Sequence, residues 1–344
     1  MTRIYIATDD ELLIASGNNG LWTVGTRLAG LSPRCLAVDP LRPERVYCGT
    51  AGHKLWHSAD ASASWGAAGA GIAHADVTAV AVSPRERAGA FGVLYAGTEP
   101  SALFRSEDGG GAWRELQGMR ALPSAPTWSY PPRPHTNHVR WITPDVADAA
   151  RLYVCIEAGA LVRSLDGGAT WLDRGPDGPL DTHTLLMHPR VPGRLYAAAG
   201  DGFDAPGRGY NESRDGGETW ERPDEGLEHH YLWSVAADPG DAATIVVSAA
   251  RSPEAAHAPR HAASAVYRRA GHAPWQQVRD GLPPMEGPTV AVLAANPSEP
   301  GVFYAASNRG IYRSADAGIT WGRLGAEWPA RYQDQRVEAL VVTD

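Results

Sequence analysis

The chain has 344 residues, of which 43% are hydrophobic and 20% are charged, and its formal net charge is −8. This balance is typical of a folded globular protein and excludes an intrinsically disordered chain. A net negative charge disfavours general binding to nucleic acid, because phosphates need a basic footprint. No apolar run approaches the roughly 20 residues of a membrane helix. We therefore expect neither a nucleic acid nor a membrane as partner.

The N-terminal segment MTRIYIATDD enters a strand-like pattern at once and lacks the basic and apolar regions of a signal peptide. We therefore expect a cytoplasmic protein. The three cysteines, Cys35, Cys48 and Cys155, lie in apolar strand-like runs, which indicates buried free thiols. There is no Cys-x-x-Cys metal spacing, and the sequence predicts no cofactor and no metal.

Further along the chain, two motifs alternate in phase. The first is a short apolar strand, a turn that usually contains Pro, and a second strand ending in small residues, as in LAVDPLRPERVYCGT (36–50) and LLMHPRVPGRLYAAAG (185–200). The second is Ser-x-Asp with a Trp five residues after the Asp. Its five copies are SADASASW (58–65), SEDGGGAW (106–113), SLDGGATW (164–171), SRDGGETW (213–220) and SADAGITW (314–321).

Together the two motifs predict four short strands per repeat of about 50 residues, which is typical of a β-propeller. Six repeats are complete. The N-terminal segment 1–30 has a second, third and fourth strand but no first strand, and RVEALVVTD at 336–344 supplies one. We predict an all-β, single seven-bladed propeller of four-stranded blades over residues 1–344. Its ring is closed by residues 336–342 pairing with residues 3–8.

The Ser-x-Asp motif resembles the Asp-box, or BNR repeat, of sialidases, two-propeller xyloglucanases, sortilin-type receptors and photosystem assembly propellers. Its residues are suited to a turn, since the Asp can accept backbone hydrogen bonds and the glycines allow positive φ. In the resembling families this turn lies on the face opposite the active site. We therefore assign a structural role to the motif aspartates, which are Asp60, Asp108, Asp166, Asp215 and Asp316.

The opposite face has the irregular loops, at 117–138, 200–211 and 250–263. Long loops on a rigid scaffold commonly carry binding sites. Aligning the first strands on their terminal Pro places ionisable and aromatic residues at the strand starts, where they would surround the mouth of the central channel. As catalytic candidates we take His138, His183, Arg336 and Glu338. As ligand-binding candidates we take Arg34, His230, Tyr231, Trp233 and Glu157.

The chemistry of this predicted mouth stays open between alternatives. The early Phe/Tyr-Arg-Ile-Pro motif of sialidases is absent, and Arg34 and Arg336 supply only two of the three arginines that a sialidase needs. A xyloglucanase-like site needs two carboxylates, for which Asp76, Glu99, Glu157, Asp181, Asp204 and Glu338 are candidates. A site of three histidines could also hold zinc or iron.

Two kinds of function follow. In the first, a sialidase-like propeller binds a small molecule or carbohydrate at the mouth, with hydrolase-type activity. In the second, the propeller is a non-enzymatic scaffold for a protein partner.

Overall fold

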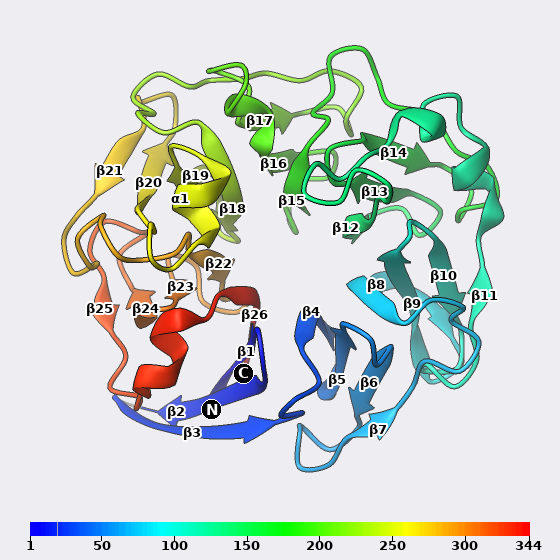
Figure 1. Ribbon diagram of the computed structural model, residues 1–344, viewed down its shortest axis with the longest axis horizontal. Coiled ribbons are helices and arrows are strands. Elements are labelled where there is room, and N and C mark those ends of the chain that lie inside the picture. The colour runs from blue at the N-terminus through cyan, green and yellow to red at the C-terminus, as the bar shows by residue number, and fades with distance from the viewer. Residues whose placement is uncertain (19) are drawn as a thin grey trace. The chain divides into compact units, whose positions relative to one another are not determined.

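The computed structural model describes residues 1–18 and 20–344, and its strands form seven antiparallel sheets (Figure 1). The sheets are the blades of a seven-bladed all-β propeller, which confirms the predicted fold. Five sheets have four strands. In spatial order these are β26 (Val337–Thr343), β1 (Thr2–Thr8), β2 (Leu12–Asn18), β3 (Leu21–Arg27); β4 (Pro33–Asp39), β5 (Arg42–Thr50), β6 (Leu55–Ser58), β7 (Gly66–Ala67); β11 (Arg114–Glu115), β10 (Leu103–Ser106), β9 (Phe91–Glu99), β8 (Asp76–Ala88); β18 (Tyr231–Asp238), β19 (Asp241–Ala250), β20 (Ser264–Ala270), β21 (Gln276–Val278); and β22 (Val292–Ala295), β23 (Phe303–Ser307), β24 (Gly310–Ser314), β25 (Gly322–Arg323).

Two sheets have three strands, and each replaces the expected fourth strand by a single bridge. Their orders are β12 (Val139–Pro144), β13 (Leu152–Ile156), β14 (Ala160–Ser164) and β15 (Thr182–Met187), β16 (Leu195–Ala199), β17 (Tyr210–Ser213). The bridges join Arg163 to Leu172 and Glu212 to Glu221. Pro176 and Pro223 follow these bridges closely, and proline has no N–H to continue a ladder.

Helices are few and short in the described residues. They are α1 (Pro253–His257) and the 3₁₀ turns η1 (Gln117–Ala121), η2 (Ala125–Thr127), η3 (Gly200–Gly202) and η4 (Ala330–Asp334). Across residues 1–18 and 20–344, no helix has the length and apolar character needed to cross a membrane.

Contacts within the chain group into two compact units, residues 1–27 with 188–344, and residues 28–187. In the first unit, Ile4, Ile6, Val290, Tyr304 and Leu340 are among the residues of a buried apolar core. In the second unit, Leu103, Val139, Ile142, Val154 and Val162 belong to another. The single domain over residues 1–344 stays a prediction.

A buried tyrosine recurs in the second strand of six sheets. These residues are each at most 1% exposed, and they are Tyr5, Tyr47, Tyr95, Tyr153, Tyr196 and Tyr304. A tyrosine fills a large volume, and its hydroxyl needs a polar partner when buried. The Tyr95 hydroxyl donates to Glu86 at 2.8 Å, and the Tyr196 hydroxyl donates to the Ala242 carbonyl at 2.6 Å. A Tyr that follows Ile, Leu, Val or Phe therefore marks a repeated packing position.

The predicted joining of the two chain ends in one sheet is confirmed. Strand β26 pairs antiparallel with β1, with Ile6 opposite Leu340 and Ile4 opposite Val342. Figure 1 shows the N and C labels beside these two strands. The Thr2 hydroxyl also donates to the Asp344 carboxylate at 3.0 Å.

Candidate functional site

Three neighbouring elements of the unit 28–187 bring His138, Glu157 and His183 together. His138 directly precedes β12, and Glu157 lies in the tight turn between β13 and β14. Val139 pairs with Ile156, and the Glu157 N–H donates to the His138 carbonyl at 3.2 Å. His183 is the second residue of β15. The Thr143 hydroxyl donates to the Leu185 carbonyl at 2.7 Å and so links β12 to β15.

The Glu157 carboxylate lies between the two histidines. His138 Nε2 is 2.8 Å from Glu157 Oε2, and Arg140 Nε is 3.6 Å from the same oxygen. His183 Nε2 is 4.0 Å from the other oxygen, Oε1. Glu157, His138 and Arg140 are buried, and His183 is fully buried. A buried carboxylate of this kind is stable only with cationic or hydrogen-bonding partners, and this one has three.

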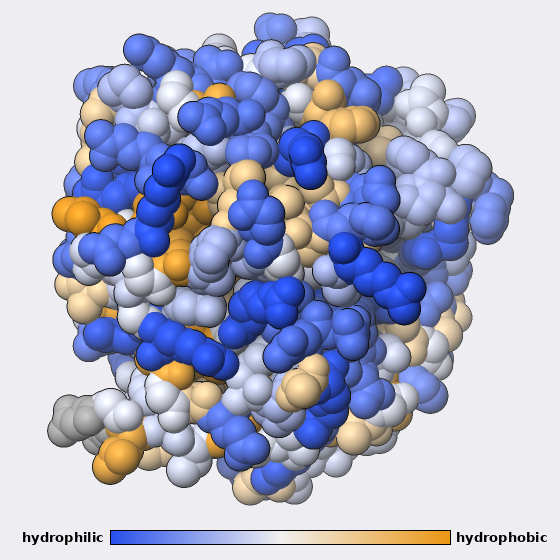
Figure 2. All heavy atoms as spheres, turned by 60° about the vertical axis from the view of Figure 1, so that its left-hand side comes forward, coloured by the Kyte–Doolittle hydropathy of each residue, from blue (hydrophilic) through white to orange (hydrophobic). Residues whose placement is uncertain are grey.

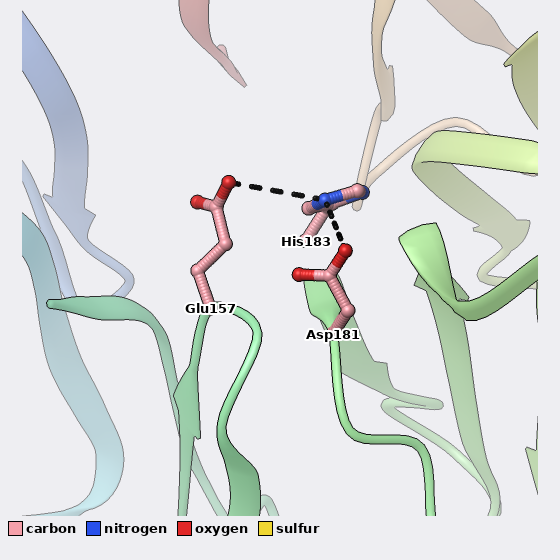
Figure 3. A group of neighbouring side chains, drawn as sticks. All are labelled: Glu157, Asp181 and His183. Atoms are coloured by element: carbon pink, nitrogen blue, oxygen red, sulfur yellow. Dashed lines mark ion pairs between the residues drawn. The ribbon is translucent and has the colours of Figure 1, made fainter. Parts of the chain in front are cut away.

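Asp181 adds a second carboxylate beside His183. The Ala158 N–H donates to Asp181 Oδ1 at 2.8 Å, which holds the carboxylate against the β13–β14 turn. Asp181 Oδ2 is 3.5 Å from His183 Nε2. Figure 3 shows the imidazole edge of His183 between the carboxylates of Glu157 and Asp181. Asp181 and His183 are two residues apart, so a strand presents them toward the same side.

The electrostatics of the cluster favour an ionised Glu157. Burial alone raises the pKa of Glu157, but the charge and hydrogen bond of His138, together with His183 and Arg140, outweigh burial. The net effect is a pKa well below the ordinary value.

The long loop 117–138 supplies a rim to the cluster. Arg133 donates to both oxygens of Glu99, from Nε at 3.0 Å and from a terminal nitrogen at 2.6 Å. This pairing raises the pKa of Arg133. The Arg133 guanidinium lies 4.9 Å from the Tyr130 ring centre, and that ring packs edge-on against His138 at 4.8 Å. Glu99 Oε2 is 3.9 Å from His138 Nδ1. The rim is thus polar, charged and aromatic.

The remaining predicted site residues lie elsewhere. Most form two groups in the unit of residues 1–27 and 188–344, and one lies in β4. In the unit formed by residues 1–27 and 188–344, Arg336 contacts Glu338 at 2.8 Å and Asp9 at 3.5 Å. In the same unit, Tyr231 and Trp233 lie on β18, and His230 precedes that strand. Arg34 is a half-buried residue of β4, in the unit 28–187.

His257 of α1 joins the β18 group and was not singled out from the sequence. The Tyr231 hydroxyl is 3.0 Å from His257 Nε2, and the rings of Trp233 and His257 pack at 4.2 Å. His257 belongs to the irregular segment 250–263, so loop length was the signal that pointed to this region.

The predicted convergence of His138 and His183 with Arg336 and Glu338 on one pocket stays a prediction. His138 and His183 both lie close to the Glu157 carboxylate, at 2.8 Å and 4.0 Å. From the sequence, Asp181 and Glu99 are predicted only as carboxylate candidates, and no role is predicted for Arg140, Tyr130 or Arg133.

The Ser-x-Asp turns share one hydrogen-bond pattern. Each Asp accepts from the Ser hydroxyl two residues before it and from the backbone N–H four residues after it. Gly167 and Gly168 have φ values of 73° and 90°, as glycine allows. Hydrogen bonds from Thr170 and Ser164 lower the pKa of Asp166 to about 2. A structural role accounts for these bonds, and the absence of a catalytic role for these aspartates stays a prediction.

No family model matches the sequence, and no curated protein matches it either. Solved structures resemble it in fold. The GH74 enzyme of Niastella koreensis is similar with a TM-score of 0.68 and 17% identity, over 93% of this chain and 52% of that enzyme. YCF48 bound to the D1 peptide is similar with a TM-score of 0.59 and 15% identity, over 91% of this chain and 94% of YCF48. A chain of the nidogen/laminin complex is similar with a TM-score of 0.52 and 9% identity, over 99% of this chain and 98% of that one.

These likenesses establish the propeller fold. The present chain spans about half the length of the Niastella koreensis enzyme and 38% of an ancestral GH74 enzyme. The neighbours include both GH74 enzymes and a protein bound to a peptide, so the fold alone does not decide between the two kinds of function.

Proposed function

We propose that this protein binds a small hydroxyl-bearing molecule, a sugar or short glycan, at the cluster of His138, Glu157, Asp181 and His183, with hydrolase-type activity there. The observation that carries the proposal is the buried Glu157 carboxylate held between two histidines, at 2.8 Å and 4.0 Å. Convergent polar groups of this kind, drawn from several elements, are typical of a small-molecule site.

The rim matches the chemistry of a sugar. Hydroxyl groups donate to carboxylate oxygens and accept from guanidinium groups. Asp181 and Glu99 offer the first kind of contact, and Arg133, which is 52% exposed in its side chain, offers the second. The ring of Tyr130 supports a flat apolar sugar face.

The carboxylate pair supports the hydrolase-type part of the proposal. One oxygen of Glu157 and one oxygen of Asp181 lie within 4.8 Å of one another. Carboxylates of this kind can activate a water for hydrolysis, either as a general base or through an ion that they hold. Asp181 is the more exposed of the two, so it is positioned to contact the ligand first.

Calorimetric titration tests the binding. Cellobiose, maltose and sialyllactose serve as probes, and at least one is expected to bind to the wild-type chain. Arg133→Gln and Asp181→Asn are expected to weaken that binding at least tenfold, because each removes a direct polar contact while the side chain is partly exposed. Asp166→Asn, in a Ser-x-Asp turn, is the matched control and should leave the affinity unchanged. Release of a reducing sugar from the bound probe tests the hydrolysis.

Two results would contradict the proposal. One is the absence of binding by all three probes to a folded wild-type chain. The other is an affinity that Asp166→Asn abolishes and Asp181→Asn preserves, because it would place the ligand on the turn face.

A second candidate function, a scaffold for a protein partner, is favoured by a cavity in the unit formed by residues 1–27 and 188–344. The cavity has a volume of about 470 Å³, and Leu282, Pro283, Met285 and Tyr312 are among its lining residues. Figure 2 brings forward the side of the molecule where β21 and β25 lie, and there small orange apolar patches are set among blue hydrophilic residues.

A peptide library selected on the wild-type chain and on Met285→Arg tests this reading. Apolar peptides retained only by the wild type would support it, and equal retention by both chains would contradict it. YCF48, a structural neighbour, is bound to the D1 peptide in its own structure.

A further inference from the structure

The geometry points to a divalent metal site formed by Glu157, Asp181 and His183. Each residue offers one ligand atom, and the three atoms lie within 4.8 Å of one another. The inference deepens the proposed function, on which it rests for its biological role, because it names a cofactor for the same site. Its ligand set stands on the geometry of these three residues.

The spacing of the three atoms is close to that of a bound ion. His183 Nε2 is 3.5 Å from Asp181 Oδ2 and 4.0 Å from Glu157 Oε1. Nitrogen and oxygen ligands at the usual 2.0–2.2 Å from zinc stand about 3–3.5 Å from one another. A small rotation of the two carboxylates therefore brings the atoms to binding distance.

Each carboxylate is oriented by a contact to its other oxygen. Asp181 Oδ1 accepts from the Ala158 N–H at 2.8 Å, which leaves Oδ2 toward His183. Glu157 Oε2 is held by His138 at 2.8 Å, which leaves Oε1 toward His183. Outer contacts of this kind fix ligand orientation in known metal sites. Figure 3 shows the resulting arrangement, with both carboxylates directed at one edge of the imidazole.

An equivalent aspartate in another blade shows which part of this cluster a structural role alone would need. Asp76 stands at the start of β8 as Asp181 stands before β15, and its Oδ1 accepts from the Gly52 N–H at 2.7 Å. Two residues later, β8 has Thr78 where the other strand has His183. The hydrogen bond from the aspartate to the neighbouring turn therefore needs no histidine two residues later. The added His183 and the nearby Glu157 turn the same structural position into a set of three ligands.

The donor set indicates the kind of ion. Two carboxylate oxygens and one imidazole nitrogen suit Zn²⁺ or Mn²⁺, whereas Ca²⁺ prefers oxygen ligands alone and Cu⁺ prefers sulfur. The Asp181 side chain is 25% exposed, which leaves coordination positions open to water or to a hydroxyl of the ligand.

The experiment uses the full chain after dialysis against EDTA, with Zn²⁺ titrated by calorimetry and the bound metal counted by mass spectrometry. The wild type is expected to bind one equivalent. Asp181→Asn and His183→Gln are expected to weaken the binding at least tenfold each. Asp76→Asn removes the equivalent turn contact and should bind Zn²⁺ as the wild type does. Since His183 is fully buried, circular dichroism checks its variant, and Asp181→Asn gives the answer if that variant does not fold.

The outcomes separate this inference from the proposed function. A wild-type chain that binds no Zn²⁺ overturns the metal site, and so does binding that Asp181→Asn leaves unchanged. Zn²⁺ binding that depends on Asp181 supports the site even if every sugar probe fails. Arg133→Gln, at the rim, should weaken sugar binding and leave Zn²⁺ binding intact.

Discussion

Glu212 of β17 is the charged centre of a buried network, and Glu212→Gln should destabilise the protein strongly. Its side chain is 3% exposed. The Tyr210 hydroxyl donates to it at 2.8 Å, and Arg194 approaches to 3.2 Å, while Arg269 donates to the same oxygen as Tyr210. The glutamine keeps the volume of Glu212 but removes its charge, which leaves two guanidinium groups, 12% and 6% exposed, without their anion.

The expected loss in the free energy of unfolding is about 3–5 kcal/mol, the usual cost of breaking a buried ion pair on one side. Arg214→Gln is the control, because Arg214 contacts Glu212 at 3.7 Å but is 55% exposed. Its loss should be about 0.5 kcal/mol or less. Urea denaturation followed by tryptophan fluorescence measures both, and Trp275, 5.2 Å from the Arg269 guanidinium, lies beside the network.

Acid titration gives a second measure of the same network. Burial raises the pKa of Glu212, but Arg269, Tyr210 and Arg194 outweigh burial and lower it. A lowered folded-state pKa adds stability that is present above the unfolded value of about 4.3 and is lost as the pH falls through the folded value. The wild type should therefore lose more stability than Glu212→Gln below pH ~4.3. A Glu212→Gln loss under about 1 kcal/mol at neutral pH with an unchanged urea slope would refute the reasoning.

Three further predictions concern the strands, the turns and the thiols. Leu340→Ala in β26 should lower the free energy of unfolding by about 2–5 kcal/mol in urea, because Leu340 is buried; a loss below 1 kcal/mol would argue against tight packing of β26. Asp215→Asn should flatten the loss of stability between about pH 4 and pH 2, because hydrogen bonds from Thr219 and Ser213 outweigh burial and lower the Asp215 pKa to about 2; identical acid melting curves would contradict this. Cys48 should react with a thiol reagent only on unfolding, because burial raises its pKa well above the ordinary value; fast labelling of the native chain would show the burial to be wrong.

The blades could be predicted from the sequence because their signals are local. The Pro-containing turn, the Ser-x-Asp turn and the alternation of apolar and polar residues in a strand each involve only a few residues. Their repetition reveals the repeat of about 50 residues. In two sheets the fourth strand is reduced to a single bridge, at Leu172 and at Glu221. This reduction was not predicted, because the length of a short edge strand depends on the path that the chain takes after it. Pro176 and Pro223, which have no N–H for a ladder hydrogen bond, follow these bridges.

The candidate site was predicted only for residues at the start or the end of a strand. His138 and His183 were found by aligning first strands, and Glu157 by its place after β13. Tyr130 and Arg133 could not be placed, because the loop that carries them is held by contacts with residues distant in the sequence, such as that of Arg133 with Glu99. Another example is the hydrogen bond from the Ser124 N–H to Asp173 at 2.8 Å. No short pattern in residues 117–138 encodes such a contact.

The pairing of β26 with β1 has a consequence for how the molecule is made. In the order of this sequence, β1, β2 and β3 are synthesised more than 300 residues before β26, the strand that completes their sheet. Until then β1 carries an open edge of backbone donors and acceptors, which invites pairing with another nascent chain. Because Thr2 and Asp344 are in hydrogen-bond contact, a short linker can join them. A gene rearranged to begin at residue 28 and to end at residue 27 would synthesise β26, β1, β2 and β3 as one continuous hairpin series, and this permuted chain should aggregate less during expression than the natural order.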